Sequence, residues 1–184
     1  YGRTPEVDLG EWRFGVFGSV EEQVELTWED FNALPRTQVI ADFHCGTLWS
    51  RLDNLWDGVL FKDVIALARP LAEARCVMVH SYGGYSTNLA LETLMEEDVI
   101  LARRHNGEEL TPDHGWPLRL VVPSRYGWKN AKWVCGLELA ADDSPGFWEK
   151  RGFNMRGDPW KEERFWPELD ASLALTLAIC SDKL

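Results

Sequence analysis

Two stretches of this sequence carry residues suited to chemistry, and they lie about seventy residues apart. The first is ADFHCGTLWS at residues 41–50, where Cys45 follows a short apolar run and stands between His44 and Gly46. A single cysteine is most often an inert, buried small hydrophobe, but a thiolate is also a nucleophile and a soft metal ligand. This stretch alone leaves both interpretations of Cys45 open.

A thiol nucleophile at Cys45 needs a histidine as its base. The adjacent His44 does not supply one, because successive residues of a strand point to opposite faces. No spacing in the sequence singles out another pair. The remaining candidates for the base and for the carboxylate that orients it are His80, His105, His114, Asp42 and Asp53.

The second stretch is the basic segment at residues 114–137, HGWPLRLVVPSRYGWKNAKWVCGL. It holds Arg119, Arg125, Lys129 and Lys132 and contains no Asp or Glu, although the whole chain has a net charge of −11. We expect its loop PSRYGWKN to be exposed at the end of a sheet. Cations and backbone N–H groups gathered on such a loop suit a phosphate or another anion. Solvated charges on a strand edge are the alternative interpretation.

The composition fits one globular domain and excludes several classes of protein. The chain has 184 residues, of which 45% are hydrophobic and 27% charged. Its strong negative charge argues against nucleic acid or an anionic membrane as the main partner. No apolar run reaches the length of a transmembrane helix, and the run ASLALTLAIC near the end is too short to span a bilayer.

The four cysteines are far apart and form no C-x-x-C pair, which excludes a zinc ribbon. Free thiols in a reducing cytoplasm are the expectation, although the first residue is Tyr1, so a leader upstream stays possible. Ten tryptophans are many for a chain of this length, and they indicate that tryptophan side chains line a core or a pocket.

The hydrophobic pattern predicts an α+β fold with a mixed β-sheet and short, scattered helices. Thr27 is expected to cap a helix that stops at Pro35, and Asn106-Gly107 to turn a hairpin within residues 98–110. The predicted strands are 12–20, 22–26, 38–43, 76–82, 118–122 and 131–139, and the predicted helices are 27–35, 61–70 and 90–97.

Three long motifs resemble one family in the same order along the chain. They are DFHCGTLWS, HGWPLRLVVPSRYGWKNAKWV and FWEKRGFNMRGDPWKEERFW. Together they are similar to the molybdopterin-binding domain of the sulfite oxidase family, in particular its compact bacterial members. The catalytic subunit of methionine sulfoxide reductase is a more distant relative. The resemblance implies an oxidoreductase domain at residues 1–166 and leaves residues 167–184 as a C-terminal tail without an assigned role.

The resemblance implies a molybdenum–molybdopterin cofactor and places its metal ligand at Cys45. A soft thiolate suits molybdenum that dithiolene sulfurs already hold, and coordination keeps the thiol deprotonated. In the family the basic segment grips the cofactor's terminal phosphate and its pterin. By residue match, His114 and Arg119 bind the cofactor, and so do the backbone and side chains of Asn130, Ala131 and Lys132. Ser81 matches a small polar pterin contact more loosely, because the loop lengths differ. His105, Cys76, Cys135 and Cys180 match no functional position of the family.

The sequence also departs from the family's pattern. Phe153 stands where sulfite oxidases have a tyrosine near the metal, and a phenyl ring donates neither a proton nor a hydrogen bond. In the family, the substrate-binding arginine lies partly upstream of the position of Tyr1 and partly in a C-terminal domain. We expect this chain to have neither that domain, nor a haem domain, nor the family's dimerisation domain. Sulfite oxidation is therefore in doubt, and electrons are expected to pass to or from a separate protein.

The hypothesis is two-electron oxygen-atom transfer at molybdenum on a small oxyanion, a sulfoxide or a similar substrate. The metal and the pterin carry the chemistry, and the protein supplies Cys45, a phosphate clamp and a shaped pocket. Two alternatives stay open: a thiol enzyme that uses Cys45 without molybdenum, and a cofactor-free interaction module on the same fold. The tryptophans proposed to wall the pocket are Trp49, Trp128, Trp148 and Trp160.

Overall fold

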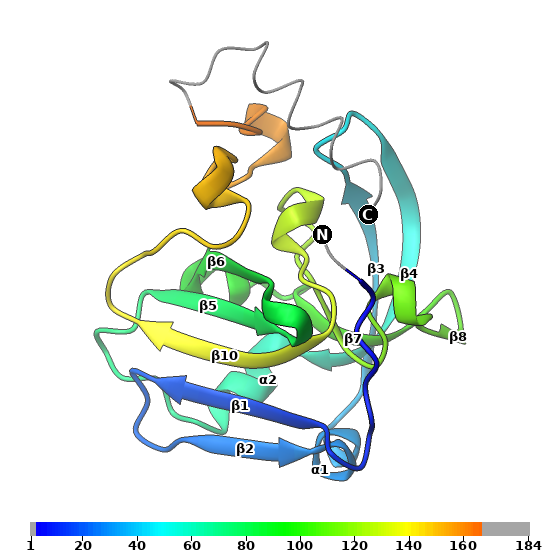
Figure 1. Cartoon of the computed structure of the whole chain (residues 1–184), viewed down its shortest axis with the longest axis vertical. Helices are drawn as coiled ribbons and strands as arrows, with labels where there is room; N and C mark the ends of the chain where they lie inside the picture. The colour runs from blue at the N-terminus through cyan, green and yellow to red at the C-terminus, as the bar shows by residue number, and fades with distance from the viewer. Residues whose placement is uncertain (1–2, 167–184) are drawn as a thin grey trace.

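The computed structural model describes residues 3–166 and contains two five-stranded sheets (Figure 1). The first sheet is mixed, because β1 and β10 run parallel while its other pairs are antiparallel. In order across the sheet its strands are β2 (Val24–Thr27), β1 (Arg13–Gly18), β10 (Val134–Ala140), β5 (Cys76–Ser81) and β6 (Ser86–Ala90).

The second sheet is antiparallel throughout and rises beside the first one in Figure 1. Its strands are β3 (Thr37–His44), β4 (Ser50–Leu60), β7 (Ile100–His105) and β8 (Glu108–Glu109), with β9 (Arg119–Val121) paired to β7. The α+β class and the mixed sheet predicted from the sequence are confirmed. The division into two sheets was not predicted.

The helices are short. Thr27 caps the first one as predicted: its side chain accepts a hydrogen bond from the N–H of Asp30, and the Asp30 side chain accepts one from the Thr27 N–H. The helix predicted at 90–97 is wrong in length, because only Leu91–Leu94 are helical. The α-helices are α1 (Trp28–Ala33), α2 (Phe61–Ala66) and α3 (Leu91–Leu94), and the single 3₁₀ turns are η1 (Tyr82–Gly84), η2 (Pro112–His114), η3 (Gly127–Lys129), η4 (Glu149–Arg151) and η5 (Pro159–Lys161).

The hairpin prediction is confirmed. Asn106 and Gly107 both have positive φ angles, 51° and 84°, and join β7 to β8. The strands β4 and β6 were missed. The sequence of β4, SRLDNLWDGVL, shows no alternation, and its pairing with β3 is interrupted by an irregularity between Ala41 and Phe43.

The main core lies between the first sheet and α2. Fully buried side chains of β1 and β5, among them Phe14 and Val77, pack in one cluster with Phe61 and Ile65 of α2. A separate aromatic cluster forms around Tyr126, Trp128 and Phe153. Among residues 3–166 no helix is long and apolar enough to cross a membrane. The predicted C-terminal tail and Cys180 lie outside the described residues.

Candidate cofactor site

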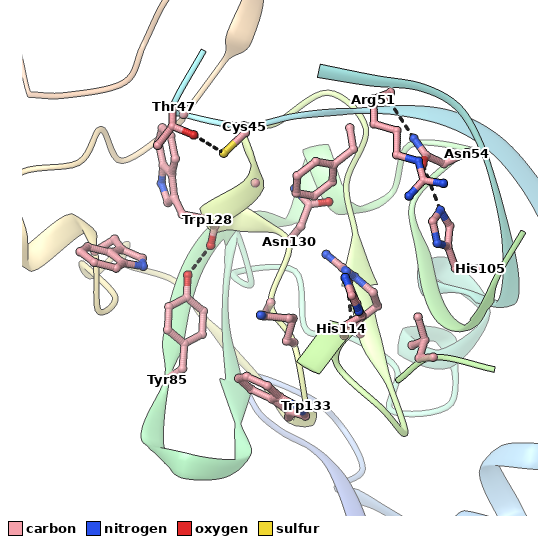
Figure 2. Close-up of a pocket in the computed structure, with 18 of the residues that line it drawn as sticks. Cys45, Thr47, Arg51, Asn54, Tyr85, His105, His114, Trp128, Asn130 and Trp133 are labelled. Carbon is pink, nitrogen blue, oxygen red and sulfur yellow. Dashed lines mark hydrogen bonds between the residues drawn. The ribbon is translucent and has the colours of Figure 1, made fainter. Parts of the chain in front are cut away.

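One cavity of about 530 Å³ collects most of the residues that the sequence singled out (Figure 2). Strands of the second sheet, η3 and the segment after β10 contribute its walls. Of the predicted site residues, Cys45, His114, Arg119, Asn130, Ala131 and Lys132 line it. The other lining residues are Phe43, Gly46, Thr47, Trp49, Arg51, Asn54, Trp56, Tyr85, His105, Leu110, Gly127, Trp128, Trp133, Trp148 and Phe153.

Cys45 sits at the turn that joins β3 to β4. Its backbone N–H donates to the carbonyl of Trp49 at 2.9 Å, and its carbonyl accepts from the N–H of Leu48. The half-buried thiol lies 3.0 Å from the hydroxyl of Thr47. Leu48 takes a left-handed conformation with φ 73°, which closes the turn tightly. The turn therefore presents the sulfur to the cavity from a fixed backbone.

Aromatic rings enclose the Cys45 end of the cavity. The rings of Trp128 and Phe153 meet edge to face at 4.9 Å, and Trp148 packs against Phe153 at 5.1 Å. A Cβ at Gly46 would lie 3.0 Å from the Trp128 ring, so a larger residue would require that ring to shift. Phe153 is 6% exposed and shapes the pocket wall, as expected from its side chain.

Arg119 forms the basic end of the cavity. Its guanidinium is buried, lies over the rings of Trp56 and Phe43 at 5.1 and 5.6 Å, and donates through Nη1 to the carbonyl of His114. Burial lowers the pKa of Arg119 to about 10, so the group stays charged at neutral pH. No carboxylate pairs with it among residues 3–166.

Lys132 and His114 stand beside Arg119. The ammonium of Lys132 donates to the carbonyl of Asp113 at 2.9 Å and lies 4.8 Å from the Trp133 ring. Burial and, to a lesser degree, the nearby Arg119 charge lower the pKa of Lys132. Nδ1 of His114 is hydrogen-bonded to the hydroxyl of Thr111 at 2.7 Å.

Asn130 lines the cavity, but its side chain is engaged elsewhere. Its Oδ1 accepts from the N–H of Val122, and its Nδ2 donates to the carbonyls of Arg125 and Tyr126. The side chain thus fixes the shape of the loop, which leaves its backbone as the part that faces a ligand. The expectation that a ligand meets the Asn130 side chain does not fit these bonds.

The expected exposure of the loop PSRYGWKN is also wrong. Tyr126, Trp128, Lys129 and Asn130 are buried. Lys129 is fully enclosed, donates to Asn88 and forms a 2.7 Å ion pair with the equally enclosed Glu149. Glu149, the acid that neutralises Lys129, lies outside the basic segment. The charge pattern of the sequence gave no reason to connect these two residues.

Two other candidates lie away from the cavity wall. Ser81 is buried at the end of β5, where its N–H donates to the carbonyl of Tyr85, and it does not line the cavity. Its looser family match therefore finds no support in the structure. Trp160 is 70% exposed and contacts the His44 ring, whereas Trp49, Trp128 and Trp148 do line the cavity.

Sequence reasoning missed the polar wall formed by Arg51, Asn54 and His105. In Figure 2 these residues lie across the cavity from Cys45 and Trp128. Asn54 and His105 occupy the neighbouring strands β4 and β7 and are hydrogen-bonded to each other at 3.0 Å. This wall was missed because β4 was not predicted, and only the pairing of β4 with β7 brings Asn54 beside His105.

The electrostatics of the cavity oppose those of the whole chain. Arg51, Arg119 and Lys132 line it, and none of the lining residues found within 3–166 is Asp or Glu, in a protein of net charge −11. Several buried donors lack a partner there: Nε of Arg119 and the indole N–H groups of Trp56 and Trp128. Unpaired buried donors of this kind indicate an anionic, acceptor-rich ligand, which a phosphorylated pterin is.

The chemistry of the donor set fits one metal–thiolate bond. Within residues 3–166 no group of three or more His, Cys, Asp or Glu side chains is placed to hold a metal ion. Cys45 would therefore be the single described protein ligand, and the remaining ligands would belong to a cofactor. This matches a metal that arrives already held by dithiolene sulfurs.

A thiol–imidazole pair is not formed. Each of the four histidines hydrogen-bonds another side chain, and none of these partners is Cys45: the pairs are His44–Ser50, His80–Glu138, His105–Asn54 and His114–Thr111. The thiol-enzyme alternative thus lacks its base in this structure.

Comparisons with known proteins show the family of the chain. The profile of the oxidoreductase molybdopterin binding domain matches residues 1–148. The uncharacterised oxidoreductase YuiH of Bacillus subtilis is 46% identical over 158 residues, which cover 86% of this chain and 80% of YuiH. Sulfite oxidase of Arabidopsis thaliana is 29% identical over 191 residues, covering 84% of this chain and 49% of that protein.

A solved structure shows the same fold. The sulfane dehydrogenase SoxCD of Paracoccus pantotrophus superposes with a TM-score of 0.70 at 26% identity, covering 81% of this chain and 42% of the SoxCD chain. The chain therefore spans most of YuiH but about half or less of sulfite oxidase and of the SoxCD chain. The protein belongs to the oxidoreductase molybdopterin-binding domain family, and its fold is that of the sulfite oxidase group.

Proposed function

We propose that this domain binds molybdenum–molybdopterin with Cys45 as the protein ligand of the metal, and that it catalyses two-electron oxygen-atom transfer. The phosphate end of the cofactor meets Arg119, Lys132 and His114, and the backbone at Asn130 and Ala131 borders it. The substrate is a small oxyanion, a sulfoxide or a molecule of similar size.

The observation that carries this proposal is the unpaired, buried charge of Arg119 in a cavity without acids that also holds Cys45. A buried cation without a carboxylate is costly for the protein alone. A phosphate monoester repays that cost through charge-assisted hydrogen bonds. Cys45 lines the same cavity, which supports its assignment as the ligand of the metal.

The bound cofactor supplies the redox and oxygen-atom chemistry. The protein's own residues bind it and shape its surroundings. The Thr47 hydroxyl, 3.0 Å from Sγ, donates to Cys45 when the thiol is deprotonated. Trp128, Trp148 and Phe153 line the same cavity as Cys45 with aromatic rings. Because Phe153 has no polar atom, it donates neither a proton nor a hydrogen bond to a substrate in this cavity.

We further propose a separate electron-transfer protein as redox partner and the cytoplasm as the place of action. The described cysteines Cys45, Cys76 and Cys135 are all free thiols, which a reducing compartment maintains. The excess of acidic residues disfavours nucleic acid as a partner.

The domain boundary at residue 166 extends beyond the profile match, which ends at 148. The packing of the last segment supports the longer boundary. Phe153 lines the cavity and is bridged to Phe165, and both rings belong to the aromatic cluster around Trp128. Removing residues 149–166 would therefore remove a wall of the site.

A substrate screen tests the proposed activity. Protein produced in a host that makes the cofactor is assayed with sulfite, sulfoxides and N-oxides, using artificial electron donors and acceptors. We expect turnover of at least one class and loss of that turnover in Cys45→Ser, with Cys135→Ser as the matched control away from the cavity. Molybdenum-loaded protein that turns over none of these substrates would contradict the proposal. Activity that survives without molybdenum but disappears on alkylation of Cys45 would favour the thiol enzyme instead.

A further inference from the structure

Asn54 fixes the chemical state of His105. The side chain of Asn54 is 1% exposed, and its Nδ2 donates to the carbonyls of Ala41 at 3.2 Å and Arg51 at 2.8 Å. The reversed amide would aim its oxygen at two carbonyl oxygens, so this orientation is determined by its surroundings. Oδ1 of Asn54 must therefore be the atom that faces His105.

An amide oxygen only accepts, so Nε2 of His105 carries the hydrogen of their 3.0 Å bond. In a neutral imidazole the other nitrogen, Nδ1, then has a free lone pair. The Trp56 ring stacks on the imidazole at 4.3 Å and holds its plane. No residue within 3–166 hydrogen-bonds Nδ1, and the ring borders the cavity.

The surroundings keep His105 neutral. Burial and the charges of Arg51, Arg119 and His114 lower its pKa from 6.5 to about 4. The buried side-chain atoms beside this ring that lack a partner are donors, namely Nε of Arg119 and the indole N–H of Trp56. His105 thus contributes a nitrogen acceptor to a cavity that is otherwise rich in donors.

We propose that His105 is a positioning ligand of the cofactor, which accepts a hydrogen bond at Nδ1 from an N–H group of the pterin while Asn54 holds the imidazole in the required tautomer. A pterin carries an amino group and ring N–H groups, whereas a phosphate at neutral pH presents mainly acceptors. Arg119 and His105 therefore recognise opposite hydrogen-bonding characters and fix which way round the cofactor lies. This inference rests on the proposed function.

Nitrogen-15 NMR of the apo protein from a cofactor-deficient host tests the tautomer without any activity assay. At pH 7 we expect His105 to be neutral, protonated at Nε2 and bare at Nδ1. In the loaded protein the Nδ1 resonance should shift toward that of a hydrogen-bonded acceptor, with Nε2 still protonated. A doubly protonated ring, a hydrogen on Nδ1, or an Nδ1 resonance unchanged by loading would overturn the inference.

Cofactor retention in His105→Phe gives the second measurement. Phenylalanine keeps the stacking on Trp56 and removes the acceptor, so release of the cofactor, followed by the fluorescence of its oxidised pterin, should be roughly two- to tenfold faster than in wild type. His80→Phe, whose histidine pairs with Glu138 on the first sheet, is the matched control and should release at the wild-type rate.

The two hypotheses fail in different ways. Wild-type protein that acquires no cofactor in a competent host contradicts the proposed function. Wild-type protein that is loaded, with His105→Phe retaining the cofactor equally long, contradicts only the role of His105.

Discussion

Arg119 is buried among aromatic rings without an acid beside it. Replacing it should therefore stabilise the apo protein but weaken its hold on the cofactor. In Arg119→Met the apo protein no longer has to bury an unpaired charge, so its free energy of unfolding should rise by about 1–4 kcal/mol. The same variant should hold the cofactor at least tenfold less well, because a charge-assisted contact to phosphate is lost.

Chemical denaturation of the apo protein and cofactor release from the loaded protein measure these two effects. Arg69→Met serves as the control, since Arg69 is exposed and pairs with Glu21 and Glu22 on the surface. If Arg119→Met destabilises the apo protein and keeps the cofactor, Arg119 is a structural residue and the phosphate assignment is wrong.

The lowered pKa of His105 predicts how the folding stability of the protein depends on pH. Its pKa is about 4 in the folded protein and 6.5 as an isolated group, so the unfolded chain takes up the proton first as the pH falls. The contribution of neutral His105 to stability is therefore complete above about pH 6.5 and is lost between about 6.5 and 4.

Urea unfolding of apo wild type and apo His105→Phe at pH 7.5 and pH 5 measures this contribution. Wild type should lose more stability over this interval than the variant, because only wild type contains the group that is protonated on unfolding. Equal losses in both proteins would show that His105 titrates normally in the folded state.

At the scale of elements, the ion pair between Lys129 and Glu149 joins η3 to η4 behind the cavity. Thr87 and Asn88 of β6 complete the network, since Thr87 donates to Glu149 and Lys129 donates to Asn88. The residues next to Lys129 on either side, Trp128 and Asn130, line the cavity. The pair thus holds the cofactor loop against the segment that carries Phe153.

Glu149→Gln should cost about 3–5 kcal/mol in free energy of unfolding, because it leaves the enclosed ammonium of Lys129 without its counter-charge. The double variant Lys129→Met, Glu149→Leu should recover most of that loss, since neither charge then needs to be desolvated. A double-mutant cycle of wild type, Lys129→Met, Glu149→Leu and the double variant, measured by denaturation, checks this coupling. A loss in the double variant equal to the sum of the losses in these two single variants would contradict it.

The elements differed in how far the sequence predicted them. The cap at Thr27 and the turn at Asn106-Gly107 were predicted correctly because each depends only on neighbouring residues. The strand β4 pairs with both β3 and β7, but it was missed because its own sequence shows no alternation of apolar and polar residues. The burial of Lys129 was missed for a related reason, since its partner Glu149 is twenty residues away.

The residues of the site were likewise predicted where a local sequence signal or a family motif marked them. Arg119 and Lys132 were found because their segment lacks acids, and Cys45 was assigned through family resemblance. The pair of Asn54 and His105 depends on the register of β4 against β7, in which Trp56 lies opposite His105. No local sequence signal contains that register, so this wall of the cavity was visible only in the structure.

At the scale of the whole molecule, the cavity draws its walls from around both sheets. Cys45, Arg51 and Arg119 belong to the second sheet or its turn, while Tyr85 and Trp133 flank strands of the first. A bound cofactor would therefore hold the two sheets together, and unfolding of the loaded protein would have to release it.

Loaded and apo protein should consequently differ in thermal stability. A ligand that binds only the folded state at a hundred times its Kd adds about 2.7 kcal/mol. The loaded protein should melt in a single transition at a clearly higher temperature than the apo protein. Identical melting temperatures would show that the cofactor makes no net contribution to the folded state.

The molybdenum content of purified protein shows whether Cys45 binds the metal. Wild type, Cys45→Ser and Cys135→Ser are produced in the same cofactor-competent host and analysed for metal per chain. Cys135 is a suitable control, because it lies on β10 away from the cavity and burial raises the pKa of its thiol to about 11. We expect one molybdenum per chain in wild type and Cys135→Ser and none in Cys45→Ser. Wild type without molybdenum, or Cys45→Ser with as much as wild type, would contradict this expectation.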